Sequence, residues 1–176
     1  MNVLQTIHDA QNGSRDAFIS LIRNNEGVMY AIARNILRTD NDAADAMQEA
    51  ILKAYSNIGN LREPAYFRTW LIRILINECR QIVRYNSKFV SIAAVMEPTA
   101  AYQGLDSKLE MEELLEQLDM DHKEVVVLYY MEDISVKEIA GMLDISEGTV
   151  KSRLYRARTK LATLLKDADM KEEHWL

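Results

Sequence analysis

The 176-residue chain contains little cysteine, histidine, proline or glycine. Its single cysteine, Cys79, excludes an intramolecular disulfide and any zinc site built from several cysteines. The three histidines, His8, His122 and His174, lack the spacing of metal ligands, and no glycine-rich phosphate loop is present. Carboxylates are scattered over helix faces in the manner of solvated side chains. We therefore expect no metal, no other cofactor and no enzymatic activity.

Long apolar runs are also missing. No segment approaches the ~20 apolar residues of a membrane span. The first residues, 1–9, lack the basic stretch and following apolar run of a secretion signal. We therefore expect a soluble, cytoplasmic protein that does not insert into a membrane.

Charge is distributed unevenly behind a net value of −6. Residues 1–91 carry 11 Lys and Arg against 9 Asp and Glu, residues 92–144 carry 3 against 13, and residues 145–166 carry 6 against 1. Two basic lobes therefore flank an acidic segment, and only the basic lobes are suited to polyanionic partners.

The scarcity of proline and glycine allows helical periodicity along most of the chain, which predicts an all-α fold. A helical stretch begins at Val3, breaks near Gly13 and continues to Thr39. Further helices are predicted over about 42–58, 64–84, 107–118, 121–131, 135–142 and 146–166. Polar caps followed three residues later by glutamate, at Asp121–Glu124 and Ser135–Glu138, predict capping boxes.

The helical pattern breaks over residues 86–106, apart from a short apolar turn expected at 90–96. We interpret 1–88 and 107–176 as two small helical domains and 89–106 as a flexible linker. About 20 extended residues reach ~65 Å, roughly the length of 19 base pairs of DNA.

The strongest motif is a helix-turn-helix near the C-terminus. A short helix with Ile139 and Ala140 facing inward precedes a three-residue turn, residues 143–145, and Ser146 is placed to cap the next helix. That second helix has an inward apolar stripe, which consists of Val150, Leu154, Ala157, Leu161 and Leu164.

The outward face of the second helix suits DNA recognition. Small and polar residues at its start permit close approach to base edges, and the cations behind them can meet guanine or phosphate. A basic helix alone is more often a solvated face of a bundle, but the preceding helix and short turn favour recognition. The candidate DNA contacts are Glu147, Gly148, Thr149, Lys151, Ser152, Arg153, Tyr155, Arg156 and Lys160.

A second constellation lies on the apolar helix over 64–84. Arg73, Asn77, Arg80 and Arg84 form one narrow polar stripe, and Tyr66 and Trp70 extend it toward the N-terminus. Aromatic rings beside arginines suit unpaired bases, which stack while their backbone is neutralised. The competing interpretation is ordinary core packing, which we expect for Phe67 and which is about equally plausible for Trp70. Cys79 is expected to be an inert buried thiol.

A third feature is the polar side of the helix over 42–58, which consists of Asp42, Asp45, Gln48, Glu49 and Lys53. By itself this side resembles an ordinary solvated helix face.

Three segments resemble the extracytoplasmic-function (ECF) group of the sigma-70 family. Residues 42–50, DAADAMQEA, are similar to its D-A-E-D-x-x-Q-E segment. Phe67–Ile74 followed by Asn77 is similar to its F-x-x-W-L-x-x-I-x-x-N segment. Ile134–Ala140 and Gly148–Arg158 resemble its C-terminal DNA-reading module. Each segment alone is moderately specific, but the three in this order and chain length are highly specific.

The resemblance implies sigma region 2 over 1–88, sigma region 4 over 107–176, and a factor that directs core RNA polymerase to promoters. Asp42, Asp45, Gln48 and Glu49 would dock the clamp helices of the largest polymerase subunit, and the flap of the second-largest subunit is a further partner. The −35 element would be read by the helix over 146–160. The −10 element would be contacted by Asn60, Arg62, Tyr66, Trp70, Arg73, Asn77, Arg80 and Arg84, with the Asn60–Tyr66 loop accepting a flipped base. A membrane-linked anti-sigma factor is the expected inhibitor.

The chain departs from the family pattern at Gln81, where an acidic residue is common, and in a thinner arginine cluster after it. These departures leave the −10 base preference open. Two alternatives remain on sequence grounds: a helix-turn-helix regulator that binds an operator unaided, and a helical scaffold that never touches DNA. The first alternative would resemble a two-component response regulator, whose receiver domain needs alternating strands and helices, whereas residues 1–91 are predicted to be helical throughout. The second alternative leaves both basic stripes unexplained.

The acidic segment over 92–144 has a possible role in this scheme. Because phosphate contacts give sequence-independent affinity, its negative charge would repel DNA from the free protein. We hypothesise that productive binding then requires core polymerase to position the two basic surfaces.

Overall fold

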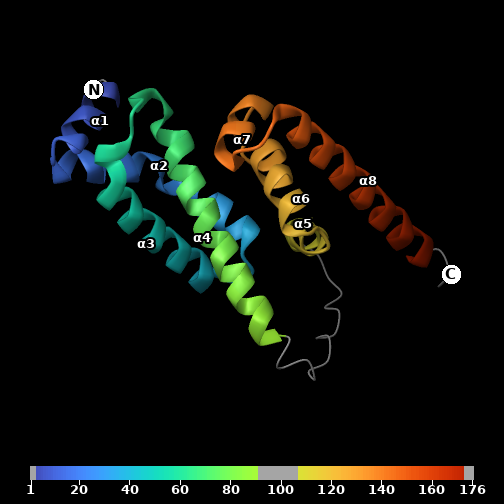
Figure 1. The fold of residues 1–176 in the computed structure, drawn as a ribbon. Helices are drawn as coiled ribbons and strands as arrows, with labels where there is room; N and C mark the ends of the chain where they lie inside the picture. Colours follow the sequence, from blue (N-terminus) through green and yellow to red (C-terminus); the bar gives the residue numbers. More distant parts are fainter. Residues whose placement is uncertain (1–2, 91–106, 173–176) are drawn as a thin grey trace. The chain divides into compact units, whose positions relative to one another are not determined.

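The computed structural model describes residues 3–90 and 107–172. These residues contain helices and turns but no strand, which confirms the all-α prediction (Figure 1). None of their helices combines the length and the apolar character needed to cross a membrane. Two compact units are present: the first contains α1–α4, and the second contains most of α5–α8.

The first unit begins with α1 (Val3–Gln11) and α2 (Arg15–Ile36), which pack against each other. Gly13 separates them at a φ of +94°, a backbone conformation that favours glycine. Ser14 then accepts a hydrogen bond from the Ala17 N–H and caps α2. The predicted break near Gly13 is therefore confirmed.

Helix α3 (Asp40–Asn57) begins two residues before the predicted start, because Thr39 caps it by accepting from the N–H of Asp42. All of its buried residues are alanines with fully covered side chains: Ala43, Ala46, Ala50 and Ala54. Small side chains allow α3 to lie close to α2 and α4, its two main neighbours (Figure 1). Met47 and Ile51, also predicted to face inward, are half-buried.

Two short 3-10 turns, η1 (Ile58–Asn60) and η2 (Pro64–Tyr66), lead into α4 (Phe67–Val90). Pro64 therefore occupies a separate turn rather than the first turn of the long helix. At its other end α4 runs to Val90, beyond the predicted end at Arg84. It includes residues 89 and 90 of the predicted linker, while residues 91–106 lie outside the described residues.

The core of the first unit forms between α2, α3 and α4. Met29 and Ile32 from α2 and Leu71 and Leu75 from α4 are almost fully buried. Phe67 and Cys79 are also buried, as predicted. Removing such a side chain costs about 2–5 kcal/mol through lost burial and the cavity left behind.

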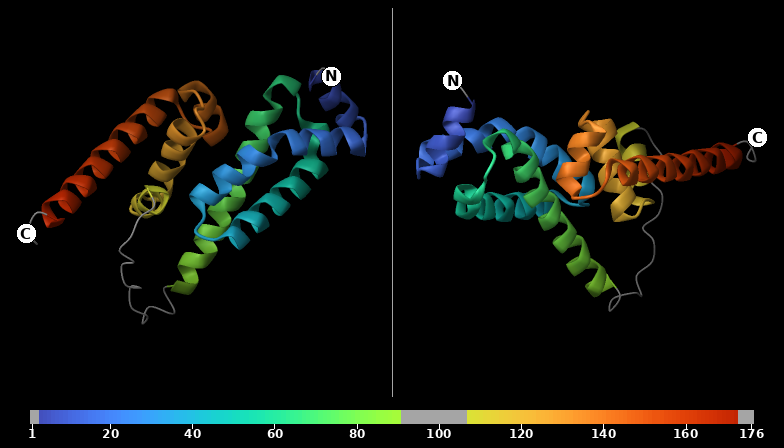
Figure 2. Two further views of the ribbon diagram at one scale, coloured as in Figure 1. Left: turned by 180° about the vertical axis from the view of Figure 1, so that it is seen from behind. Right: turned by 45° about the horizontal axis from the view of Figure 1, so that its top comes forward.

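The remaining elements, most of whose residues belong to the second unit, are α5 (Ser107–Glu116), α6 (Met120–Val126), a π-helical turn η3 (Val127–Met131), α7 (Val136–Leu143) and α8 (Glu147–Glu172). Helix α6 packs against α8, and their buried residues include Val125, Val150 and Leu154. Figure 2 shows α8 as the longest element of this unit, following α7 after a short turn.

The predicted capping box at Asp121 is wrong. Asp119 caps α6 instead, because its carboxylate accepts from the N–H of His122 at 3.2 Å. Glu124, the expected partner in the box, is fully buried. Two aspartates stand two residues apart here, and the sequence pattern did not identify which one begins the helix.

Candidate functional site

The helix-turn-helix has the predicted local chemistry. The Glu138 N–H donates to the hydroxyl of Ser135 at 3.3 Å, and the Ser135 N–H donates to the Glu138 carboxylate at 3.2 Å. This reciprocal capping box starts α7, as predicted for Ser135–Glu138.

Asp144 ends α7 in the left-handed conformation, at a φ of +58°. Aspartate tolerates this conformation better than most residues, because its short polar side chain can form local hydrogen bonds. The Ile145 N–H closes the turn on the carbonyl of Ala140 at 3.1 Å. Ser146 then accepts from the N–H of Thr149 at 3.0 Å, which confirms its predicted capping role.

Helix α8 presents two different faces after this turn. Val150, Leu154 and Ala157 are buried, whereas Leu161 and Leu164, at the end of the predicted stripe, are half-buried. The candidate DNA contacts lie mainly on the exposed side: Glu147, Gly148, Lys151, Ser152, Tyr155, Arg156 and Lys160. Thr149 is half-buried, and its hydroxyl is 2.9 Å from that of Ser146.

Arg153 differs from the other candidate contacts. Its Nη2 lies 2.6 Å from the Asp121 carboxylate on α6, and its side chain is only 20% exposed. Its Nη1 is buried and has no hydrogen-bond partner. The guanidinium therefore joins α6 to α8, a role that the spacing along one helix did not reveal.

The predicted stripe on α4 lies on one side of the first unit. Arg73, Asn77 and Arg84 are exposed and Arg80 is half-buried. Trp70 is half-buried and packs against the ring of Phe67, with 5.9 Å between the ring centroids. Tyr66 is 64% exposed at the N-terminal end of the same stripe. Trp70 thus contributes to the core and still borders the polar surface.

The predicted base-accepting loop, Asn60–Tyr66, begins inside a short turn whose two ends are buried. Ile58 and Leu61 are buried at the ends of this turn, whereas Asn60 between them and Arg62 directly after them are exposed. The Leu61 N–H closes the first turn on the carbonyl of Ile58 at 3.1 Å. The candidate side chains are therefore presented outward from a short turn with fixed ends.

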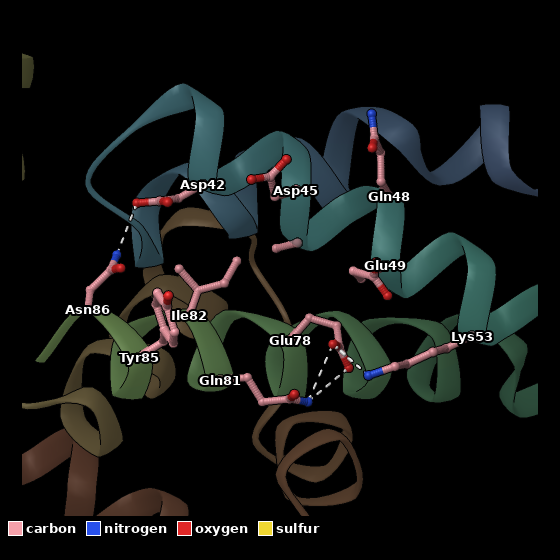
Figure 3. A pocket seen from close by; sticks show the side chains of 11 residues that line it. Asp42, Asp45, Gln48, Glu49, Lys53, Glu78, Gln81, Ile82, Tyr85 and Asn86 are labelled. Atoms are coloured by element: carbon pink, nitrogen blue, oxygen red, sulfur yellow. Dashed lines mark hydrogen bonds and ion pairs between the residues drawn. The ribbon is translucent and has the colours of Figure 1, made fainter. Parts of the chain in front are cut away.

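The polar side of α3 lines a groove against α4 (Figure 3). Asp45, Gln48 and Glu49 are exposed, and Asp42 is half-buried, 3.4 Å from the amide nitrogen of Asn86. The groove has a volume of about 590 Å³, and Ile82 and Tyr85 of α4 line its other side. It combines a carboxylate-rich edge with apolar and aromatic surface.

Sequence reasoning missed the contact that joins the two walls of this groove. Glu78 of α4 is 6% exposed, and its carboxylate lies 2.7 Å from the Lys53 ammonium of α3 (Figure 3). The Gln81 amide nitrogen also donates to both Glu78 oxygens at 3.3 Å. A glutamate beside buried Cys79 in an apolar helix was the available signal, because buried carboxylates require a partner.

The cap of α6 carries a shifted pKa. Partial burial opposes the shift, but hydrogen bonds from the ring and the backbone N–H of His122 hold the pKa of Asp119 below its usual value. Among the described residues, no group of three or more histidine, cysteine, aspartate and glutamate side chains is arranged to hold a metal ion.

Comparison with known families matches both units. The model for sigma-70 region 2 matches residues 21–89, and the model for sigma-70 region 4 matches residues 108–161. The ECF RNA polymerase sigma factor SigM of Mycobacterium tuberculosis is 34% identical over 158 residues, which cover 87% of this chain and 79% of that protein. The ECF sigma factor SigW of Bacillus subtilis is 28% identical over 184 residues, which cover 95% of this chain and 98% of SigW.

Two solved structures are similar to this chain. CnrH in complex with the cytosolic domain of CnrY has a TM-score of 0.74 and 27% identity, covering 95% of this chain and 98% of the solved chain. The sigma factor RpoE of Bartonella quintana, in complex with the anti-sigma factor NepR, has a TM-score of 0.70 and 25% identity, covering 85% and 96%.

Proposed function

Because the chain belongs to the ECF group of the sigma-70 family, we propose that it binds core RNA polymerase and directs it to promoters with defined −10 and −35 elements. The observation that carries this proposal is the presence of two candidate nucleic-acid surfaces, one in each helical unit. A stripe of arginines and aromatics lies on α4, and a recognition helix follows the turn after α7. The chain acts through binding, and RNA synthesis is left to the polymerase.

The start of α8 reads the −35 element in the major groove. Gly148 and Ser152 leave room for base edges near the helix N-terminus, and both are exposed. Arg156 and Lys160 follow one and two turns later on the same exposed side. Arginine suits guanine or phosphate, whereas lysine supplies a point charge to phosphate.

The loop and stripe of the first unit act on the −10 element. Asn60 is exposed between buried Ile58 and Leu61, and exposed Arg62 follows directly, which favours capture of a base leaving the duplex. Exposed Tyr66 supplies a stacking surface for a base. Arg73 and Arg84, further along α4, neutralise the backbone of the same DNA strand. Opening is therefore assigned to the loop and to the exposed part of α4.

The groove between α3 and α4 docks the clamp helices of the largest polymerase subunit. Exposed Asp45, Gln48 and Glu49 supply the polar rim for a partner helix. Ile82 and Tyr85 supply apolar contact inside it. The second unit contacts the flap of the second-largest subunit.

An anti-sigma factor controls this activity in the cytoplasm. Two similar structures are complexes, with the cytosolic domain of CnrY and with NepR, and these support an inhibitor that binds a sigma factor of this fold. We extend the proposal to a membrane-linked inhibitor that covers the polymerase and DNA surfaces until a signal releases it.

Run-off transcription tests the proposed function directly. The full chain is added to core polymerase with a library of promoter fragments, and promoter-specific transcripts are expected. A chain that binds DNA specifically but never redirects core polymerase would contradict the proposal and support an operator-binding regulator.

A matched pair of substitutions on α8 tests the assignment of its DNA face. Arg156 and Arg158 are both exposed, but two residues along a helix turn the side chain by about 200°. Arg156→Ala should weaken −35-dependent transcription about five- to a hundredfold, the range of a lost base contact. Arg158→Ala changes the net charge equally and should have little effect, whereas equal losses would contradict the assigned face.

A further inference from the structure

The side chain of Gln11, the last residue of α1, contacts the loop between α3 and α4. Its Nε2 donates to the carbonyl of Leu61 at 2.7 Å and to the carbonyl of Ile58 at 3.2 Å. A glutamine amide has two N–H groups, so one side chain can satisfy both acceptors. Gln11 thereby contacts both ends of the turn that contains Gly59 and Asn60.

The rest of α1 is well placed to support this contact. Ile7 and Ala10 are buried, and the helix packs against both η1 and η2. Gln5, by contrast, is an exposed glutamine on the same helix whose amide bonds Asp9 at 2.9 Å. Gln5 therefore offers a matched control for substitutions at Gln11.

The loop itself needs such support. Gly59 and Asn60 are exposed, and the Ile58–Leu61 turn is closed by one backbone hydrogen bond. A loop that is already held in its binding shape loses less conformational entropy when a ligand binds. Contacts from Gln11 reduce the freedom of the turn before any base arrives.

We propose that Gln11 is a positioning residue for promoter opening: it holds the Ile58–Leu61 turn in the shape in which Asn60 receives an unpaired base. The inference rests on the proposed function of the Asn60–Tyr66 loop. Helix α1 precedes the residues matched by the region 2 model, which begin at 21. Gln11 acts through the loop backbone and is not expected to contact DNA.

The test compares the contribution of a single base to binding. Holoenzyme is assembled from core polymerase and the full chain, and its affinity is measured for promoters already unpaired at the −10 element. One promoter is intact, and each of the others lacks one non-template base. The ratio of the affinity for the intact promoter to that for an abasic promoter is the base-dependent ratio. It isolates base capture from every other contact.

Two substitutions remove the contact without large changes in shape. Gln11→Glu replaces the donating amide by an acceptor, and Gln11→Met removes the hydrogen bonds. Each should lower the base-dependent ratio about three- to tenfold, the effect of losing one or two neutral hydrogen bonds, while affinity for the abasic promoter stays near that of the wild type. Gln5→Glu should leave both affinities unchanged.

The outcomes separate this inference from the proposed function. A wild type with no base-dependent ratio at any position would overturn the role of the loop itself. A clear wild-type ratio that both Gln11 variants retain would overturn the role of Gln11 alone. Equal losses on intact and abasic promoters would indicate a general folding defect and would also overturn it.

A substitution in the loop provides a second measurement with Gln11 left in place. A Cβ added at Gly59 would meet nothing within 4 Å, so Gly59→Ala restricts the turn without a clash. We expect a base-dependent ratio at least equal to that of the wild type. A lower ratio would contradict the idea that restricting this turn assists base capture.

Discussion

Replacing Asp121 by asparagine should increase the affinity of the second unit for −35 DNA. The Asp121 carboxylate lies 2.6 Å from Nη2 of Arg153, one of the residues predicted to contact DNA. While this ion pair persists, DNA phosphate must compete with the carboxylate for the same guanidinium. Asparagine keeps the shape of the side chain but removes its charge.

The size of the gain follows from the exposure of the pair. The Asp121 side chain is 54% exposed, which places the pair among surface ion pairs worth about 0.2–1 kcal/mol. If the ion pair no longer opposes DNA binding, the affinity for DNA rises by the same free energy, about 1.4- to fivefold. If the released Arg153 then neutralises one phosphate, the salt dependence also steepens by about 0.9 in log K against log salt.

Fluorescence anisotropy of the full chain on a labelled −35 duplex, measured over a range of salt concentrations, provides the assay. Glu113→Gln removes the same charge from an exposed position on α5 and reports the general effect of a less acidic protein. The gain of Asp121→Asn should exceed that of Glu113→Gln. It should disappear in the double variant that also carries Arg153→Met.

Two results would refute this reasoning. A gain that persists in the Arg153→Met background would show that Arg153 is not the group released. Equal gains for Asp121→Asn and Glu113→Gln would reduce the effect to net charge and leave Arg153 with a contact inside the second unit only.

Three further predictions concern stability and charge. Lys53→Met should lower the free energy of unfolding by about 1–3 kcal/mol, because the buried Glu78 carboxylate loses its charged partner and keeps the Gln81 amide. Glu78→Gln should recover part of the loss in urea unfolding. Asp119→Asn keeps a capping oxygen but removes a carboxylate whose pKa is lowered in the folded state. Its destabilisation should be present above about pH 4 and vanish as the pH falls through that lowered pKa, and equal destabilisation in acid would contradict this sign. Neutralising Glu110, Glu112, Glu113 and Glu116 together should raise the salt-dependent DNA affinity of the free chain, and unchanged affinity would contradict the repulsion hypothesis.

Features that depend on neighbouring residues in the chain were predictable. The capping box at Ser135, the cap at Ser146 and the turn between them follow from local side-chain hydrogen bonds. The inward stripe of Val150, Leu154 and Ala157 follows from the helical period alone. The helix-turn-helix therefore emerged almost complete from the sequence.

Helix boundaries were less predictable where the residues allow more than one choice. Asp119 and Asp121 are both good caps, and in the structure Asp119 caps α6 while Glu124 is buried. The end of α4 was missed because Asn86 and Ser87 suggested a break. Their weak preference against helix is easily outweighed by favourable neighbours.

The contacts that shape the candidate surfaces could not be read from the sequence, because each joins residues far apart in the chain. Gln11 bonds acceptors 47 and 50 positions away, Lys53 meets Glu78 across 25, and Asp121 meets Arg153 across 32. A polar residue on a helix surface gives no indication of which distant group it will meet. Lys53 therefore resembled a solvated charge, and Asp121 a helix cap, until the fold was known.

These three contacts share a physical consequence. Each lies beside a candidate surface and holds a loop or a pair of helices in position. At Gln11 and at Glu78 the groups that do this are not among the side chains predicted to bind a partner, whereas Arg153 is. Where support and recognition use different residues, as at Gln11 and at Glu78, a substitution can weaken positioning while the binding side chains remain intact. At Arg153 the same guanidinium serves both purposes, so the internal contact and DNA binding oppose each other. The Asp121→Asn variant is therefore expected to gain affinity for DNA, whereas Gln11→Glu and Lys53→Met are expected to lose function or stability.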